Sequence, residues 1–525
     1  MRTLRIFCAL LLLLAFALFG AAFSNDAHAA RDSNSEGKRI YEARCAWCHD
    51  SDGTGYGVAA KYLNPPPRDF SMGEFKWKSS HFGSTVPTEA DLYAMISGLS
   101  EKSKGSSSRG SSGWSGIAGT SMPGWDDILS KKEIEAVAAY VLSLAYIEEP
   151  LPVEGVDLSG RVKSTEESIK SGRKLFKDRC SECHGMRGRG NASKRLKDDT
   201  GERTWARNLT KPWLFRTGSG RDAVFTRIST GIDGTQMPAF ANPKSRKALT
   251  ETERWDVANF VVSIVEQYKE PLPGTVIEAV KVTGALPESP TALEWDRAAY
   301  ASFYMLPQIV AKERHFTPSV ESVSIKALYN SESLSLLLEW DDPTESLPGE
   351  RKSEKIAGGS VYVDAAAVQF PRELAGFSDG SGSVADTPYF GMGSAKKPVD
   401  IWYWNGPGYG TAESVRLIEA KGAGALEHKE GATAGLVGMG VYDEGTWRVV
   451  MTRSLDATTG GGTLPVAFAL WDGSNTERGS KHTMTSWTKI AFETETDIML
   501  YILPAFLFIL VLGIEIVWLC NIDRW

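Results

Sequence analysis

Four of the six cysteines in this chain are the residues best suited to chemistry, because they form two C-x-x-C-H motifs. The motifs are Cys45-Ala46-Trp47-Cys48-His49 and Cys180-Ser181-Glu182-Cys183-His184. Two thiols at this spacing can each add to a haem vinyl group, and the adjacent histidine can then ligate the iron. A redox C-x-x-C pair or half a zinc site would explain one copy at best, and no further cysteines complete a zinc tetrad. We therefore predict two covalently bound haem c groups, attached through Cys45, Cys48, Cys180 and Cys183, with His49 and His184 as iron ligands.

Each motif lies within one half of a tandem duplication. Every half is predicted to start with a short helix, continue through C-x-x-C-H and a long irregular segment, and end in an amphipathic helix and a proline-rich linker. The matching segments are Gly37–Tyr41 with Gly172–Phe176, Val137–Leu144 with Val257–Ile264, and Glu149–Pro152 with Glu270–Pro273.

On these motifs, residues 35–275 resemble class I cytochromes c, which implies two all-α domains over residues 35–150 and 160–275. The resemblance also implies a sixth iron ligand, a methionine in a loop before the last helix. Met122 and Met237 match that position, each followed by a proline, and Met95 is the alternative in the first half. A thioether ligand favours reduced iron and raises the reduction potential.

An arginine recurs at one position of the two halves, in Pro67-Arg68-Asp69-Phe70 and Ala206-Arg207-Asn208-Leu209. Arg68 and Arg207 could each pair with a haem propionate, which is an anion that needs a partner when buried. A capping turn with a solvated arginine is the alternative, and the sequence leaves both open.

Residues 276–492 contain no cysteine and read as short strands separated by glycine-rich polar loops. Apolar residues alternate in the runs 333–340 and 466–471, and similar runs cover 322–329, 360–370, 399–404, 447–455 and 487–492. Seven or more such strands predict an all-β antiparallel sandwich.

Several phrases in this region resemble the haem-b-binding gamma subunit of ethylbenzene dehydrogenase and its relatives, which serve molybdopterin enzymes of the dimethyl sulfoxide reductase family. The phrases are Trp340-Asp341-Asp342-Pro343, Asp364–Pro371, Tyr389–Gly393, Ile401–Trp404 and Trp471–Asn475. The resemblance implies one haem b held between Met392 and Lys481. The neighbouring His482 is a better iron ligand on general grounds, so it stays open as the alternative to the lysine.

Both ends of the chain are hydrophobic. Residues 1–29 have a basic start, an apolar middle and Ala27-His28-Ala29, which predicts a cleaved secretory signal, with an uncleaved anchor as the alternative. Residues 498–520 contain one charged side chain, Glu515, and are long enough to cross a bilayer. Arg524 follows this segment and acidic residues precede it, so we predict a single-pass inner-membrane protein with its bulk in the periplasm.

The composition fits a multidomain globular protein, since 42% of the 525 residues are hydrophobic and 23% are charged. The net charge of −7 gives no reason to expect nucleic acid as a partner. Six-coordinate haems leave no position for a substrate, so we predict no catalytic residues and an electron-transfer role. By resemblance, the partners are a molybdopterin catalytic subunit, its iron–sulfur subunit, and a soluble cytochrome c or terminal oxidase. A dihaem peroxidase and a haem- or sugar-binding sensor are the alternatives from other classes.

Overall fold

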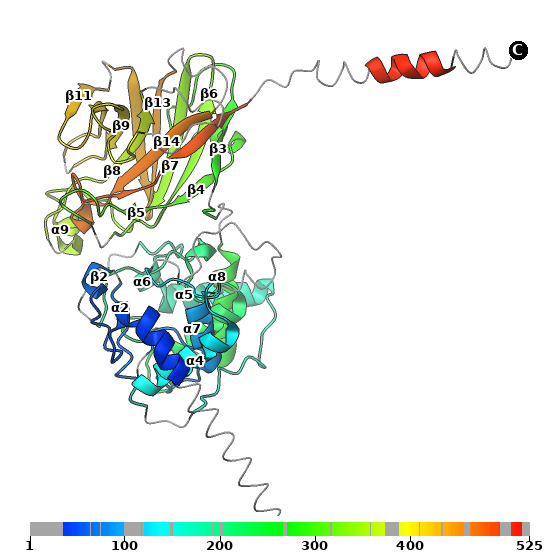
Figure 1. The fold of residues 1–525 in the computed structure, drawn as a ribbon, viewed down its shortest axis with the longest axis vertical. Helices are drawn as coiled ribbons and strands as arrows, with labels where there is room; N and C mark the ends of the chain where they lie inside the picture. Colours follow the sequence, from blue (N-terminus) through cyan, green and yellow to red (C-terminus); the bar gives the residue numbers. More distant parts are fainter. Residues whose placement is uncertain are drawn as a thin grey trace, which may run out of the picture.

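The computed structural model describes residues 35–493 and 506–516, apart from internal gaps at residues 64, 74, 99–116, 118–119, 148–150, 192–193, 195, 200, 202, 266–269, 273, 316–317, 358, 373–387, 409, 432–433 and 456–462. The predicted signal segment 1–29 lies outside the described residues. Figure 1 shows a helical body that holds the N-terminal half of the chain and, above it, a β-sheet body that holds most of the remainder.

The helical body consists of two units that repeat the same succession of helices. The first has a helix over residues 35–44, followed by α2 (Ala46–His49), η1 (Ala60–Tyr62), α3 (Glu89–Ser97) and α4 (Lys131–Leu144). The second has α5 (Glu166–Arg179), α6 (Ser181–His184), β1 (Leu196–Lys197), β2 (Arg203–Thr204), η3 (Pro212–Leu214), α7 (Arg221–Thr230) and α8 (Glu251–Ser263). Both units are helical, as predicted, but the second is not all-α, because β1 and β2 pair as a short antiparallel sheet within it.

A glycine lets the first and last helices of each unit cross closely. A Cβ on Gly37 would lie 2.2 Å from the backbone oxygen of Ala136, and one on Gly172 would lie 2.0 Å from that of Asp256. Only glycine fits such an approach. Aromatic pairs flank both crossings, Tyr41 with Tyr140 at 5.3 Å and Phe176 with Phe260 at 5.2 Å between ring centroids. The duplicated glycine is thus a packing requirement.

The last helix of each unit begins at the same kind of cap. The Ser130 hydroxyl accepts the backbone N–H of Glu133 at the start of α4, and the Glu133 carboxylate accepts the backbone N–H of Ser130. Thr250 and Glu253 make the same reciprocal pair at α8. Such capping boxes satisfy two donors that the first turn of a helix leaves unpaired.

Among the described residues, the β-sheet body has fourteen strands, with short helices between some of them. In chain order, these strands and helices are β3 (Val276–Lys281), η4 (Leu293–Arg297), β4 (Ala301–Tyr304), β5 (Leu306–Pro307), β6 (Ser322–Tyr329), β7 (Ser333–Asp341), α9 (Arg351–Ala357), β8 (Ala365–Pro371), β9 (Val399–Asn405), β10 (Ser414–Ala420), β11 (Leu426–Glu430), β12 (Leu436–Asp443), β13 (Thr446–Ser454), β14 (Thr463–Trp471), η6 (Gly473–Asn475), β15 (Thr483–Met484) and β16 (Thr488–Phe492).

The prediction of a purely antiparallel sandwich is wrong, because the sheet is mixed. Its main path runs β11-β10-β9-β8-β14-β16-β3-β6-β7-β13-β12. β3 pairs in parallel with both β16 and β6, while the other pairings on this path are antiparallel. The physical reason is that β3, which follows the second helical unit, inserts between two strands that already run in one direction.

The two halves of this sheet face each other across one core. Leu336 of β7 and Val449 of β13 come from one half, and Val368 of β8 and Trp404 of β9 come from the other. Trp340 packs between the halves, 6.3 Å from Trp404 and 6.2 Å from Trp447 between ring centroids. The strict alternation of side chains in these strands sends every second residue into this core.

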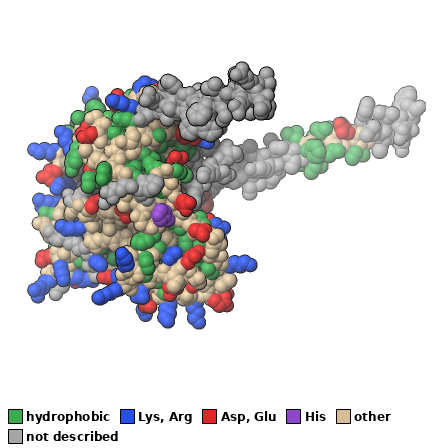
Figure 2. Space-filling view, turned by 90° about the horizontal axis from the view of Figure 1, so that it is seen from below, with side chains coloured by type: hydrophobic (Ala, Val, Ile, Leu, Met, Phe, Trp, Pro, Cys, Tyr) green, Lys and Arg blue, Asp and Glu red, His purple; other side chains and the backbone are tan. Residues whose placement is uncertain are grey.

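A helix over residues 506–516 follows the sheet body and carries exposed apolar side chains, with Glu515 as its acidic residue (Figure 2). Phe506, Phe508 and Ile509 are each more than 60% exposed. Among the residues that the structure describes, no helix combines the length and apolarity that a membrane crossing requires. The remaining residues of the predicted span, 498–505 and 517–520, lie outside the described part.

Candidate haem sites

Each C-x-x-C-H histidine is fixed by a hydrogen bond from one ring nitrogen. His49 Nδ1 lies 3.1 Å from the backbone oxygen of Arg68, and His184 Nδ1 lies 3.0 Å from that of Arg207. A backbone carbonyl at Nδ1 sets the tautomer of a metal-ligating histidine and leaves Nε2 for the iron. Burial lowers the pKa of both imidazoles, so each is held in the neutral form that can bind metal. The two sites share this geometry, which fits haem c.

The cysteines do not have the properties of a redox C-x-x-C pair. Burial raises the pKa of Cys45 and of Cys180 to about 12, whereas reactive dithiols have a lowered pKa. Cys48 and Cys183 lie one helical turn further, at the ends of α2 and α6. Each pair thus lies beside its histidine on one short helix.

The loops that carry Met122 and Met237 have the same hydrogen bonds. Thr120 Oγ1 donates to the Ile117 carbonyl at 2.8 Å and accepts the Met122 N–H at 3.1 Å. Thr235 Oγ1 makes the same two bonds at 2.8 and 3.1 Å in the second unit. The two methionines thus lie in identical local structures, and their ligation of iron stays a prediction.

These two threonines were not among the predicted site residues, although the two loops share a sequence pattern. Both loops read Ile-x-Gly-Thr-x-Met-Pro, from Ile117 to Pro123 and from Ile232 to Pro238. In each, the isoleucine N–H also bonds the methionine carbonyl at 3.1 Å. A threonine whose hydroxyl bonds nearby backbone groups fixes a turn, so Thr120 and Thr235 hold the methionines in place.

A large cavity of about 3590 Å³ connects the two helical units with the sheet body. Met122 and Met95 line it from the first unit, and His184 and Met237 line it from the second. Trp487 lines it from the sheet body. Ordinary ligand pockets measure about 300–1,000 Å³, so this cavity has room for more than one large cofactor.

Arg68 and Arg207 extend away from their own units to carboxylates of a neighbouring one. Arg68 Nη1 lies 2.8 Å from Asp199 Oδ2 in the second unit, and Arg207 pairs with Glu321 of the sheet body. Their carbonyls bind the histidines, so the recurring arginine position supports the iron site through its backbone. Pairing of the guanidinium groups with haem propionates stays a prediction.

Ion pairs between charged side chains join the two bodies. Lys211 Nζ, in a side chain that is only 2% exposed, lies 2.9 Å from Asp341 Oδ1 at the end of β7. Arg203 Nη1 donates to the Ser474 carbonyl at 2.9 Å. Within the helical body, Lys78 of the first unit pairs with Asp233 of the second. These contacts connect the three parts of the chain that carry the candidate cofactor sites.

A second apolar surface in the sheet body is the candidate haem b face. Strands β8, β9, β10 and β14 send alternate residues away from the main core, where sheets facing water usually carry polar side chains. We call this surface the outer apolar face, and it consists of Ala365, Ala367, Val399, Ile401, Ile418, Ala420 and Trp471, with Met392, Tyr403, Ala469 and Trp487 packed against them. The seven residues that form this face are themselves buried, each at most 8% exposed.

Met392 lies at this face in a constrained loop. Its backbone has a φ of 73°, an uncommon value for any residue but glycine. Gln369 of β8 holds the loop, because its Oε1 accepts the Met392 N–H at 3.1 Å and its Nε2 donates to the Phe390 carbonyl at 2.8 Å. A strained backbone held by a neighbouring strand is typical of functional sites.

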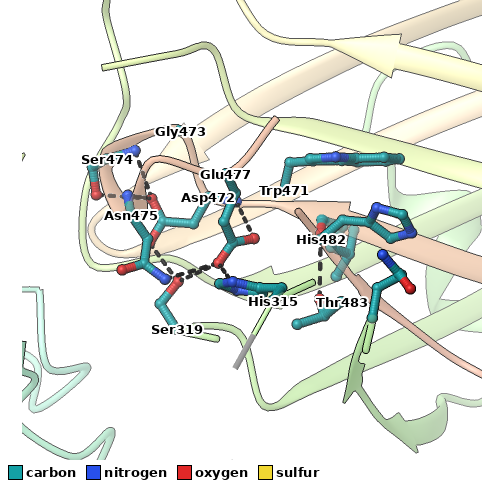
Figure 3. Close-up of polar contacts among 12 residues, drawn as sticks. His315, Ser319, Trp471, Asp472, Gly473, Ser474, Asn475, Glu477, His482 and Thr483 are labelled. Carbon is teal, nitrogen blue, oxygen red and sulfur yellow. Dashed lines mark hydrogen bonds and ion pairs between the residues drawn. The ribbon is translucent and has the colours of Figure 1, made fainter. Parts of the chain in front are cut away.

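Lys481 and His482 differ sharply in their surroundings. Lys481 is 37% exposed, and its Nζ lies 3.6 Å from Glu313 Oε2. His482 is only 4% exposed, and its ring lies 4.7 Å from that of Trp471, a member of the outer apolar face (Figure 3). Burial lowers the pKa of His482 to about 4, and its Nδ1 is bonded to the Gly479 carbonyl at 3.0 Å. The structure therefore packs His482 against Trp471 at the Ala365 end of this face, holds Met392 at the Gln369 end, and turns Lys481 toward Glu313.

Comparisons with known families match each part of this architecture. A family model described as Cytochrome c matches residues 35–145 and again residues 169–264. A family model described as Ethylbenzene dehydrogenase matches residues 292–415. The tandem duplication and the separate sheet body found in the sequence thus correspond to two cytochrome c domains and one ethylbenzene dehydrogenase-type domain.

Three curated proteins of related sequence are each 28% identical to this chain over the matched region. The ORF7 protein of Haloferax mediterranei, named as a respiratory nitrate reductase haem subunit, matches over 39% of this chain and 68% of its own length. Chlorate reductase subunit gamma of Ideonella dechloratans matches over 41% of this chain and 84% of its own length. Dimethylsulfide dehydrogenase subunit gamma of Rhodovulum sulfidophilum matches over 41% of this chain and 80% of its own length.

Proposed function

Because the chain joins two cytochrome c domains to a domain of the ethylbenzene dehydrogenase family, we propose that it is the electron-transfer subunit of a molybdopterin oxidoreductase. Electrons would pass between that enzyme and a cytochrome c or a terminal oxidase of the respiratory chain. The named gamma subunits among its relatives support this proposal, and the chain adds two c-type units to a gamma-type domain.

The observation that carries the proposal is that each helical unit contains one histidine and one methionine held by the same local hydrogen bonds. His49 and His184 each have Nδ1 bound to a carbonyl, and Met122 and Met237 lie on identical threonine-held loops. An iron with both axial positions filled by protein exchanges electrons but has no position for a substrate. A dihaem peroxidase needs one open iron, so the second methionine loop argues against that alternative.

Haem b would be held at the outer apolar face by Met392 and one residue of the loop after β14. The family resemblance names Lys481, and the burial of His482 against Trp471 makes the histidine its competitor. When bound, a haem of this kind supplies reversible one-electron transfer. The protein would position the macrocycle, exclude water from it and set its potential through the axial ligands.

The sheet body would dock on the molybdopterin and iron–sulfur subunits, and the helical units would face the acceptor. We also propose that residues 498–520 anchor the chain in the inner membrane with its bulk in the periplasm. The exposed apolar side chains of the 506–516 helix support an anchor, because an uninterrupted apolar surface on one helix is costly in water. Acidic residues before the segment and Arg524 after it support this orientation.

Affinity purification from detergent-solubilised membranes tests the complex and the anchor together. We expect the tagged chain to co-purify with molybdenum at about one atom per chain and with a subunit that contains iron–sulfur clusters. Protease added to intact spheroplasts should digest the chain, and truncation after residue 493 should release it into the soluble periplasmic fraction. Recovery of the full-length chain alone, free of molybdenum and in the soluble fraction, would overturn the proposal.

A further inference from the structure

Three buried aspartates meet where strands β7, β8 and β14 end or begin. Asp342 directly follows β7, Asp364 directly precedes β8, and Asp472 directly follows β14. Each is at most 1% exposed, and one carboxylate oxygen from each lies within 4.8 Å of the other two. These residues belong to the phrases that resemble the ethylbenzene dehydrogenase family, and none of them is among the predicted haem ligands.

The hydrogen bonds of this cluster leave one carboxylate oxygen unsatisfied. Asp364 accepts the N–H groups of Ser346, Gly473 and Trp447. Asp342 Oδ1 accepts the backbone N–H of Thr344 at 3.1 Å, whereas Asp342 Oδ2 is buried and has no hydrogen-bond partner among the described residues. A buried acceptor without a donor costs free energy and requires an explanation, such as an ion.

The Asp472 carboxylate is held by its own turn. The backbone N–H groups of Ser474 and Asn475 donate to Asp472 Oδ1, and the Ser319 hydroxyl donates to Oδ2 at 2.6 Å (Figure 3). This set of donors is neutral, so it orients the carboxylate without cancelling its charge. The carboxylates of the cluster are thus positioned in advance for a further partner.

The charge of the cluster has no cationic side chain to balance it. Among the described residues, no lysine or arginine pairs with the three aspartates, and His315 is paired with Glu477 at 3.0 Å. A cation between the three buried carboxylates would balance their charge.

We propose that Asp342, Asp364 and Asp472 bind one Ca²⁺ ion. The donors are all oxygens, which suits a hard cation, and no sulfur or ring nitrogen is present among the three to favour zinc or copper. Ca²⁺ bonds oxygens at about 2.3–2.6 Å, so it can bridge carboxylates that lie within 4.8 Å of one another. Mg²⁺ demands near-ideal octahedral geometry, whereas Ca²⁺ accepts the irregular arrangement of carboxylates that are already fixed by hydrogen bonds.

The ion would stabilise the part of the sheet body that carries the outer apolar face. Ala365 of that face follows Asp364, and Trp471 of that face precedes Asp472. The loop from Asp472 leads to Lys481 and His482. A cation at the strand ends therefore positions this loop against the face, and its loss should loosen the loop without breaking the c-type units.

Metal analysis of the purified full chain tests the site directly. After dialysis against metal-free buffer, we expect about one Ca²⁺ per chain, and less than about a tenth of that in Asp342→Asn. Chelation with EGTA should lower the melting temperature of the sheet body by roughly 5–10 °C, and added CaCl₂ should restore it. Asp342→Asn keeps the shape of the side chain and should abolish this response.

The matched control is Asp296→Asn, which removes an exposed aspartate of η4 in the same body and should keep both the Ca²⁺ and the EGTA response. The proposal is overturned if the wild-type chain contains no Ca²⁺ and melts at the same temperature with EGTA and with CaCl₂. Stoichiometric Mg²⁺ or Zn²⁺ in place of Ca²⁺ would equally reject the assignment. Because metal content and melting are read in the wild type, these outcomes do not depend on haem b or on a partner enzyme.

Discussion

Replacing Met237 by histidine is expected to lower the reduction potential of one c-type haem by about 0.1–0.3 V, a part of the roughly 0.8 V that axial ligands span. The thioether stabilises reduced iron, whereas an imidazole in its place favours the oxidised state. Met237 N–H is bound to Thr235, so the backbone at this position should persist in the variant. Potentiometric titration followed in the visible spectrum measures the shift.

Met186→His is the matched control, because Met186 lies two residues after His184 but is 59% exposed. It should leave both potentials unchanged. The equivalent experiment in the first unit compares Met122→His with Met95→His and separates the predicted ligand from its alternative. An unaltered potential in Met237→His would show that the sixth position is filled by another group.

Lys481→Ala is expected to remove haem b almost completely if the family assignment of the axial ligand is right. Met392→Ala should have the same result, because it removes the other residue that would hold this haem. His482→Ala should then retain haem b, and both c-type haems should keep their spectra in all three variants. Solvent extraction of the purified variants, followed by absorption spectroscopy of the free haem, measures the loss.

The opposite pattern, with haem b retained in Lys481→Ala and lost in His482→Ala, would assign the iron to the histidine. The burial of His482 against Trp471 and the exposure of Lys481 make this comparison informative. Met439→Ala is a suitable control, since Met439 is a 42% exposed methionine on β12 of the same body. It should keep haem b in full.

The helical units could be predicted well from sequence, because their determinants are local. C-x-x-C-H fixes two thiols and a histidine on one turn of chain, and the duplication identified the loops of Met122 and Met237 by position. Comparison with the cytochrome c family confirms these units. The role of the Arg68 and Arg207 carbonyls was not predictable, because a backbone acceptor leaves no trace in residue type.

The sheet body was harder to predict for physical reasons. Runs of alternating apolar residues predicted the strands of the core, such as β6 and β7. Whether two strands pair in parallel or antiparallel depends on partners that are distant in sequence. β3 follows the helical units and pairs in parallel with β16, more than two hundred residues later, so the antiparallel prediction was wrong. The three-aspartate cluster was equally hidden, because Asp342, Asp364 and Asp472 meet only when three strand ends converge.

Haem analysis of the purified wild-type chain tests the central claim most directly. Alkaline pyridine spectra before and after acid–acetone extraction separate covalent haem from extractable haem. A chain that relays electrons through two C-x-x-C-H units and one haem b face should contain covalent and extractable haem in a ratio of about two to one. A chain with two covalent haems and no extractable haem would contradict the three-haem relay and leave the sheet body without its proposed cofactor.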